Sequence, residues 1–348
     1  MLPPMEQPPL AEYADVRGRV RGVVLLSIVT LLWGTTFLTT RLLVAGESAS
    51  LPPSLLILYR FLVAALVFSP FLLRDKQPRS PRIAGPLAGR AATRGIPIHS
   101  KRLWLAGLEL GFWLWCGFAS QTLGLAYTTV GRSAFITSLH VVLVPALVAM
   151  TGKRVAGEIW VAAALALSGT AVLSYDRAPP NLGDLWTLVT AITYAVYILR
   201  LEPLAHRFPA LPLTAVQLWV VAALSAGWVA AEGRRLAVMD WKPVAAVLYL
   251  ALATTALTTW LQAIGQRTVP AAQAALLYTL EPVWAVAFAW LVVREGLGVQ
   301  GWIGAAAILA GAVVSQWPAL RRSAPQFSVI REREDAKTRR ECEELEPG

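Results

Sequence analysis

Residues 121–174 read QTLGLAYTTVGRSAFITSLHVVLVPALVAMTGKRVAGEIWVAAALALSGTAVLS, and residues 262–315 read QAIGQRTVPAAQAALLYTLEPVWAVAFAWLVVREGLGVQGWIGAAAILAGAVVS. The two stretches align without a gap at an offset of 141 residues, with 12 of 54 positions identical. They also share an order of features: a short polar turn, a long apolar run, a turn with a basic residue, and a Gly/Ala-rich apolar run. The chain therefore contains an internal repeat, and the repeat organises the fold prediction.

The composition indicates that the solvent of this protein is a lipid bilayer. Of 348 residues, 56% are hydrophobic and 15% are charged, with a mean hydropathy of +0.55; soluble domains carry roughly 25% charged residues. Apolar runs of about 18 or more residues indicate transmembrane helices. About ten such runs occur, near 22–44, 54–73, 103–126, 131–151, 156–175, 182–201, 212–231, 243–266, 271–293 and 298–317. The predicted fold class is all-α integral membrane, with about ten transmembrane helices.

The repeat predicts two five-helix units of opposite orientation. The first unit covers 22–175 and includes a basic loop at 74–102, the second covers 182–317, and a polar tail follows at 318–348. Because five is odd, the second unit must enter the membrane from the other side. Inverted repeats are the recurring construction of secondary transporters, with the substrate site near the midplane between the halves.

The charge distribution predicts the orientation. With the N-terminus in the cytoplasm, 23 Lys and Arg residues fall inside and seven outside, as the positive-inside rule requires. The net charge of +10 is thus explained by topology, and nucleic acid is not an expected partner. The loop 74–102 is expected to be cytoplasmic, either simply solvated or touching anionic headgroups. Both termini are predicted to be cytoplasmic, and the first run is longer than the roughly 7–15 residues of a signal-peptide core.

Two further stretches carry a family resemblance. LLWGTTFLTTRLL followed by LYRFLVAALVF resembles the opening of an EamA-type repeat of the drug/metabolite transporter superfamily, and 281–314 is similar to the ending of such a repeat. The resemblance implies a ten-helix inner-membrane carrier with cytoplasmic termini, commonly an exporter of amino acids or other small metabolites. The first copy departs from the pattern: Lys153 and Arg154 stand where the second has Arg294 and Glu295, so only Glu295 matches the acidic turn residue.

Two ionisable residues are predicted to lie near the bilayer midplane. Glu281 and His140 are repeat-related, and each lies about ten residues into its span. An ionised side chain at the centre of a membrane helix costs about 2.5–3.5 kcal/mol on insertion scales, so such residues are paired, face water or stay neutral. We expect them to line one cavity between the halves; the alternative is a hydrogen bond across a helix interface.

Other polar and aromatic residues extend this candidate site. Thr137 and Tyr278 lie one helical turn from the two ionisable residues and share their faces. Trp33, with Tyr194 roughly equivalent in the sixth span, lines an apolar pocket or packs in the core. The resemblance assigns Arg60 to an arginine that often opens its helix; the alternative is snorkelling to the outer headgroups. The candidate substrate-binding residues are Glu281, His140, Tyr278, Thr137, Arg60 and Trp33, with repeat-related Gln121 and Gln262 as interhelical ties or substrate contacts.

The predicted function is that of a secondary transporter. It moves a small metabolite, such as an amino acid or a related amphipathic solute, across the cytoplasmic membrane by alternating access, as an exporter. The alternatives are a lipid flippase, a channel or, least favoured, a membrane-bound transferase. The sequence contains no Walker motif, no H-E-x-x-H and no G-x-S-x-G, so neither catalysis nor a cofactor or metal is expected. The partners are the substrate and the bilayer; proton coupling and a homodimer remain open.

Overall fold

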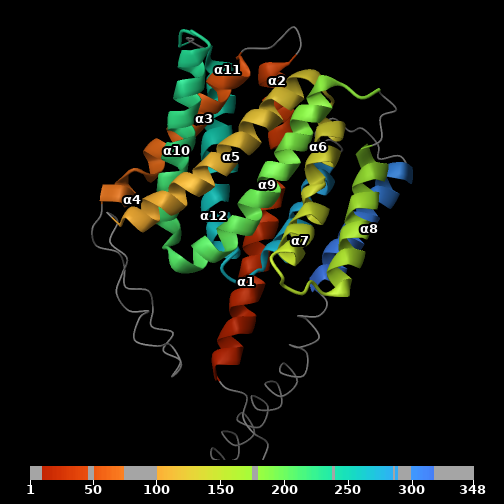
Figure 1. Ribbon diagram of the computed structural model, residues 1–348. Coiled ribbons are helices and arrows are strands. Elements are labelled where there is room, and N and C mark those ends of the chain that lie inside the picture. Colours follow the sequence, from red (N-terminus) through yellow and green to blue (C-terminus); the bar gives the residue numbers. More distant parts are fainter. Residues whose placement is uncertain are drawn as a thin grey trace, which may run out of the picture.

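The computed structural model describes residues 10–45, 51–73, 100–174, 179–236, 240–284, 287–288 and 299–316, with only the backbone for 10–16 and 174. These residues form helices joined by short turns, and no strand occurs among them (Figure 1). The helices in chain order are α1 (Leu10–Trp33), α2 (Thr36–Val44), α3 (Pro53–Phe68), α4 (Pro70–Leu73), α5 (Lys101–Tyr127), α6 (Val130–Ser138), α7 (His140–Met150), α8 (Gly157–Ser174), α9 (Leu182–Arg207), α10 (Ala210–Ala231), α11 (Trp241–Ala251), the π-helix η1 (Leu252–Leu257), α12 (Thr258–Gly265) and α13 (Ala271–Tyr278), then a helical turn at 281–284 and a helix at Val299–Gln316.

The number of membrane spans is lower in the described part than the sequence predicts. Seven helical stretches are long and apolar enough to cross a membrane. Pro53–Phe68 and Gly157–Leu173 are apolar but shorter than the usual span, and the predicted span 271–293 is only partly described. The protein is therefore a multi-pass helical membrane protein, while the count of ten is not confirmed.

Several predicted features lie outside the described residues. The basic loop lies there except for its last three residues, as do Arg294 and Glu295 in the second turn and the tail 318–348. Their structure is not part of the description that follows.

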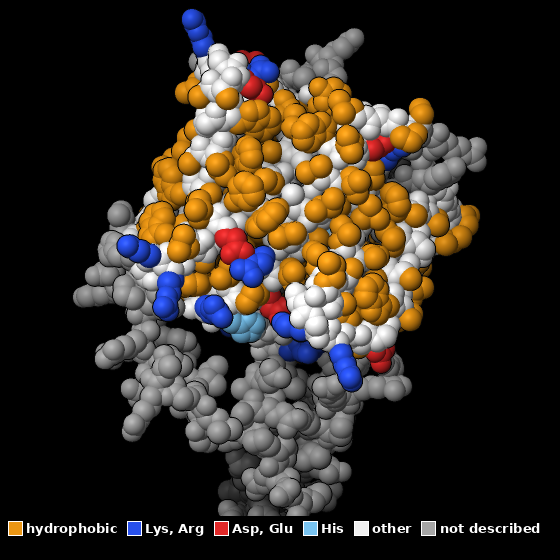
Figure 2. Space-filling model, in the orientation of Figure 1, with side chains coloured by type: hydrophobic (Ala, Val, Ile, Leu, Met, Phe, Trp, Pro, Cys, Tyr) orange, Lys and Arg blue, Asp and Glu red, His pale blue; other side chains and the backbone are white. Residues whose placement is uncertain are grey.

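The surface has the character of a lipid-facing protein. Figure 2 shows hydrophobic side chains spread over the middle of the visible face, with Lys and Arg gathered mainly toward the lower end. In Figure 1 that end carries the start of α1, the α7–α8 turn and the α9–α10 turn. These are three of the segments that the charge distribution predicts on the cytoplasmic side, so the fold brings them to one face.

Glycines allow two helix pairs to approach closely, and the two contacts correspond. A Cβ placed on Gly124 of α5 would lie 3.0 Å from the carbonyl oxygen of Gly183 in α9, and one on Gly183 would lie 2.6 Å from the carbonyl oxygen of Gly124. In the other half, Gly265 of α12 and Gly22 of α1 meet in the same reciprocal way, at 3.2 and 3.0 Å. Gly124 and Gly265 are repeat-related at the 141-residue offset. Each half therefore packs its third helix against the first helix of the other half.

Candidate substrate pocket

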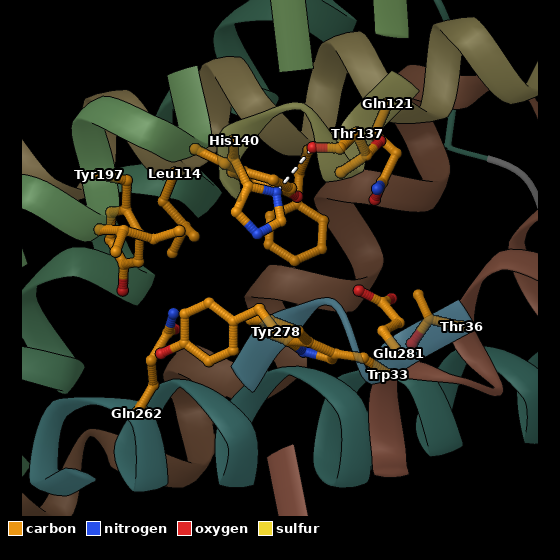
Figure 3. Close-up of a pocket in the computed structure, with 13 residues that line it drawn as sticks. Trp33, Thr36, Leu114, Gln121, Thr137, His140, Tyr197, Gln262, Tyr278 and Glu281 are labelled. Atoms are coloured by element: carbon orange, nitrogen blue, oxygen red, sulfur yellow. Dashed lines mark hydrogen bonds between the residues drawn. The ribbon is translucent and has the colours of Figure 1, made fainter. Parts of the chain in front are cut away.

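A pocket lies between the two halves, in the middle of the helix bundle. Counting the open space at its mouth, it encloses about 520 Å³. Thirteen described residues line it: Trp33, Thr36, Leu114, Phe118, Gln121, Thr137, His140, Tyr194, Tyr197, Ile198, Gln262, Tyr278 and Glu281. Figure 3 shows His140, Thr137 and Gln121 on one wall, with Tyr278, Glu281 and Trp33 on the other. The lining is mainly aromatic and polar, and Glu281 is its one carboxylate among the residues named.

Most of the lining consists of repeat-related pairs. Three pairs follow the 141-residue offset, and two pairs from the first helices of the halves follow an offset of 161 residues, which also relates Gly22 to Gly183. The pairs are Gln121/Gln262, Thr137/Tyr278, His140/Glu281, Trp33/Tyr194 and Thr36/Tyr197. Ten of the thirteen residues thus belong to five pairs, and the pocket is built where equivalent parts of the two halves meet.

The backbone breaks at the pocket in both halves. The helix α6 ends at Ser138 and α7 begins at His140, while α13 ends at Tyr278 and a new helical turn begins at Glu281. Helices interrupted near the bilayer midplane expose backbone groups and side chains to a cavity, as transporter sites do. The two ionisable residues therefore occupy equivalent positions, each at the start of the second segment of a broken helix.

A third break occurs in the first helix. There α1 ends at Trp33 and α2 begins at Thr36, so both lining residues of this helix flank the interruption. The intervening backbone still closes with Gly34 N donating to Thr30 O at 2.9 Å. The break therefore redirects the helix at the pocket without leaving the amide of Gly34 unpaired.

The imidazole of His140 presents an acceptor to the pocket. The side chain is 5% exposed, and its Nδ1 lies 2.7 Å from the backbone oxygen of Thr137, the dashed line in Figure 3. Because a carbonyl oxygen only accepts, Nδ1 carries the proton of this bond, and in the neutral ring Nε2 is then an acceptor. Nε2 is buried without a hydrogen-bond partner among the described residues, and the Ala275 backbone also acts on the imidazole.

The carboxylate of Glu281 is open to the pocket. In the described part of the chain it makes no hydrogen bond or ion pair, although Arg60 acts on it electrostatically at longer range. Two hydroxyls of the lining, Thr36 Oγ1 and Thr137 Oγ1, are likewise buried without a hydrogen-bond partner in the described residues. Buried polar groups are normally satisfied, so these open groups indicate a site that a ligand or water completes.

Arg60 lies behind the pocket wall. It is 2% exposed, so it does not snorkel to the headgroups, and it is absent from the lining. Its guanidinium donates to Thr255 Oγ1, to Thr254 Oγ1 at 3.0 Å and to Thr254 O at 3.2 Å, and its Cζ lies 4.6 Å from the ring centroid of Phe118. The π-helix η1 binds the guanidinium and the Phe118 ring covers it, and the expected direct substrate contact of Arg60 stays a prediction.

Three of the aromatic lining residues have their polar atoms hydrogen-bonded to the protein. Trp33 Nε1 donates to Thr258 Oγ1 at 3.2 Å, and the hydroxyls of Tyr278 and Tyr197 donate to Gln266 and Gln217 at 3.4 and 3.1 Å. Ring centroids of Trp33 and Tyr278 lie 5.3 Å apart, and those of His140 and Tyr278 6.4 Å apart. The rings are thus held in place, and what they offer to the pocket is chiefly ring carbon.

A family model settles the relationship of this chain to known proteins. The model of the EamA-like transporter family matches twice, over residues 20–175 and 181–316. The chain belongs to the EamA-like transporter family. The two matches are the two copies of the repeat.

Two individual proteins resemble this EamA-like transporter. An uncharacterized transporter from Archaeoglobus fulgidus is 27% identical over 290 residues, which are 83% of each chain. A protein of known crystal structure superposes with a TM-score of 0.66 at 20% identity, covering 87% of this chain and 99% of the other. At that identity the second likeness shows the fold alone.

The pocket of this EamA-like chain contains more residues than the sequence pattern singled out. Five of the six expected site residues line it, the exception being Arg60, and their role in binding stays a prediction. Thr36 and Tyr197 were missed, although the offset that relates Trp33 to Tyr194 pairs them too. Leu114, Phe118 and Ile198 carry no distinguishing signal, since an apolar residue in a membrane helix faces lipid, core or cavity equally well.

Proposed function

We propose that the protein is a secondary carrier that moves a small amphipathic metabolite across the cytoplasmic membrane by alternating access and acts as an exporter. The substrate is an amino acid or a related amphipathic solute, and both termini face the cytoplasm. The observation that carries the proposal is the composition of the pocket: five repeat-related pairs surround one cavity at helix breaks.

The reciprocal helix contacts support an inverted arrangement of the halves. The Gly124–Gly183 contact involves the end of α5 and the start of α9, whereas the Gly265–Gly22 contact involves the end of α12 and the first half of α1. In Figure 1 the start of α9 lies at the upper end and the start of α1 at the lower end. Superposing 121–174 on 262–315 should therefore require a rotation of about 180° about an axis in the membrane plane.

Alternating access follows from this arrangement. If each half can adopt either of two tilts, exchanging the tilts between equivalent halves converts a pocket open to one side into a pocket open to the other. The breaks before His140 and Glu281 let the two segments of each helix move separately, because the continuous helical hydrogen bonding is interrupted there.

The carboxylate of Glu281 couples transport to protons in this scheme. Inside the membrane an unpaired carboxylate is stable only when a proton or a positive group neutralises it. Proton and substrate then compete for one site, so that binding one on a given side releases the other. His140 lies at the equivalent position of the other half and supplies a second polar contact.

A channel or a lipid flippase is less well supported. Channels commonly use rings of like residues around a pore, whereas four of the five pairs here combine unlike side chains. The lining also encloses a local pocket with ordered aromatic rings, which fits a bound solute better than a continuous path.

The test is transport into proteoliposomes with and without an imposed pH gradient. The wild-type protein should accumulate substrate in response to the gradient, and Glu281→Gln should insert and fold yet lose that response, because the amide cannot ionise. Glu109→Gln is the matched control: Glu109 pairs with Arg200 on the exposed side of α5 and α9, at 3.0 Å for the Nη2–Oε2 contact. If Glu281→Gln flux still follows the gradient as the wild type does, Glu281 is structural and proton coupling through it is excluded.

The substrate itself is found by comparing the medium of cells with and without the protein. An exporter should enrich its substrate in the medium of expressing cells, and the Glu281→Gln variant should reduce that enrichment. Depletion from the medium would reverse the proposed direction.

A further inference from the structure

Two ionisable groups of the pocket offer acceptors from opposite walls, while the amide of Gln121 and the hydroxyl of Tyr194 in the same lining can also donate. The carboxylate oxygens of Glu281 only accept hydrogen bonds when ionised, and Nε2 of neutral His140 also accepts, because Nδ1 is the atom that donates to Thr137. Figure 3 shows both side chains directed into the space between the walls. The hydroxyls of Thr36 and Thr137 can donate or accept. The carboxylate of Glu281 and Nε2 of His140 therefore both favour a ligand that donates hydrogen bonds.

The described lining of the pocket offers a ligand no cationic side chain. None of the thirteen described lining residues is Lys or Arg. The guanidinium of Arg60 acts electrostatically on Glu281. It is already bound by Thr254 and Thr255 and covered by the Phe118 ring. A ligand carboxylate would therefore lie opposite Glu281 without a charged partner, and an unpaired buried charge is strongly disfavoured.

The aromatic lining adds an attraction for positive charge. Trp33, Phe118, Tyr194, Tyr197 and Tyr278 all contribute to the wall. Aromatic faces attract ammonium groups through the ring quadrupole, and the attraction is larger where water is excluded. Because the polar atoms of Trp33, Tyr197 and Tyr278 are bound elsewhere, their rings also accommodate an apolar body.

We propose that the pocket selects small organic cations, namely a protonated amine on an apolar body, and rejects the same molecule when it carries a carboxylate. The ammonium group binds between the carboxylate of Glu281 and Nε2 of His140, and the body lies against the aromatic rings. This inference rests on the proposed carrier function. Of the two substrate classes proposed there, it excludes amino acids and keeps the related amphipathic solutes, as amines without a carboxylate.

The test uses two probes that differ only in the carboxylate, 2-phenylethylamine and L-phenylalanine, with phenylacetate as the matched anion. Binding of each radiolabelled probe is measured by equilibrium dialysis on the full-length protein in lipid nanodiscs. The amine should bind at least about tenfold more tightly than the amino acid, because only the amino acid brings an acceptor against an acceptor. Phenylacetate should bind more weakly than the amine by the same margin. Equal or tighter binding of phenylalanine would overturn the proposal.

Two variants test whether Glu281 causes the preference for the amine. Glu281→Gln should remove most of the preference for the amine, while the control Glu109→Gln should keep it, since Glu109 lies outside the pocket. The wild-type comparison of the three probes stands even if Glu281→Gln does not fold. A preference that survives in folded Glu281→Gln would overturn the assignment of the ammonium group to this site.

Flux measurements distinguish a failure of the proposed carrier function from a failure of the proposed amine selectivity. Proteoliposome uptake that prefers phenylalanine to phenylethylamine would leave the carrier standing and defeat the amine selectivity. Tight binding of the amine without flux under any imposed gradient would leave the selectivity standing and defeat the carrier.

Discussion

The two halves of the pocket have equivalent backbones and different chemistry. The first half contributes a tryptophan, two threonines, a glutamine and a histidine, and the second contributes three tyrosines, a glutamine and a glutamate; the pairs are Trp33/Tyr194, Thr36/Tyr197, Gln121/Gln262, Thr137/Tyr278 and His140/Glu281. Only the glutamine pair is identical. The repeat therefore determines where the lining positions lie, while the side chains at those positions determine which solute is bound.

The ends of the pocket show a similar contrast. On the side of the α5–α6 turn, Asp184 accepts from Arg132 Nη2 and from Thr128 Oγ1, each at 2.8 Å, and the pair is about one-seventh exposed. On the side of the α12–α13 turn, the residue equivalent to Arg132 is Gln273, which accepts a hydrogen bond from Arg19. Both ends join the halves: the first contact includes an ion pair, and the second includes a hydrogen bond from Arg19 to the neutral amide of Gln273.

The largest expected effect concerns the opposite orientation of the halves. Lys153 and Arg294 are repeat-related, so inversion places them on opposite sides of the membrane. In a variant lacking Cys116 and Cys342, a cysteine at 294 should react with a membrane-impermeant maleimide in intact cells, and one at 153 should react only after lysis. Labelling of both positions from outside would end the inverted-repeat interpretation.

An exchange of the central pair would sharpen the comparison. The single substitutions His140→Glu and Glu281→His give the pocket two carboxylates or two imidazoles, and each should reduce substrate flux by about 10- to 100-fold. The double variant restores one of each at equivalent positions and should recover part of the loss, since contacting sites couple by about 0.5–3 kcal/mol. Flux in the double variant no higher than the product of the single losses would show that the two positions act independently.

A smaller effect is expected from overpacking the equivalent glycine contacts. In the present geometry, a Cβ added at Gly124 would lie 2.5–3.3 Å from atoms of the neighbouring helix, and one at Gly265 would lie 2.6–3.2 Å away, so Gly124→Val and Gly265→Val both overpack these contacts. Each should lower stability by about 1–3 kcal/mol, measured by thermal unfolding in detergent. Gly227→Val is the control, because a Cβ at Gly227 of α10 meets nothing within 4 Å. A loss at one contact and none at the other would show that the halves pack differently.

The smallest predicted effect tests the ion pair at the α5–α6 end. Asp184→Asn weakens the link between α6 and α9, so that end should open more often. With Thr137→Cys as a reporter, labelling by a maleimide from the outer side should accelerate several-fold. Glu232→Gln is the control, since Glu232 pairs with Arg234 and accepts from Ser54, away from the link between α6 and α9. An unchanged labelling rate in Asp184→Asn would show that this pair does not limit access to the pocket.

The sequence by itself determined the helical membrane class, the internal repeat and the pairing of His140 with Glu281. These depend on local properties: runs of apolar residues long enough for a bilayer, a constant offset between similar stretches, and the high cost of ionisable groups in hydrocarbon. A second offset, of 161 residues, relates the first helices of the two halves and pairs Trp33 with Tyr194 and Thr36 with Tyr197.

Only the tertiary structure decided which polar atoms remain open and which are already bound. Arg60 and Glu281 look alike in sequence, as single charges in apolar runs, yet Thr254 and Thr255 from a distant helix bind the guanidinium and leave the carboxylate facing the pocket. The break of helices before His140 and Glu281, and the hydrogen bond that makes Nε2 of His140 an acceptor, also appear only in the fold. The physical reason is that hydrogen bonding inside a membrane is a property of neighbouring helices, and neighbours far apart in sequence are set by packing.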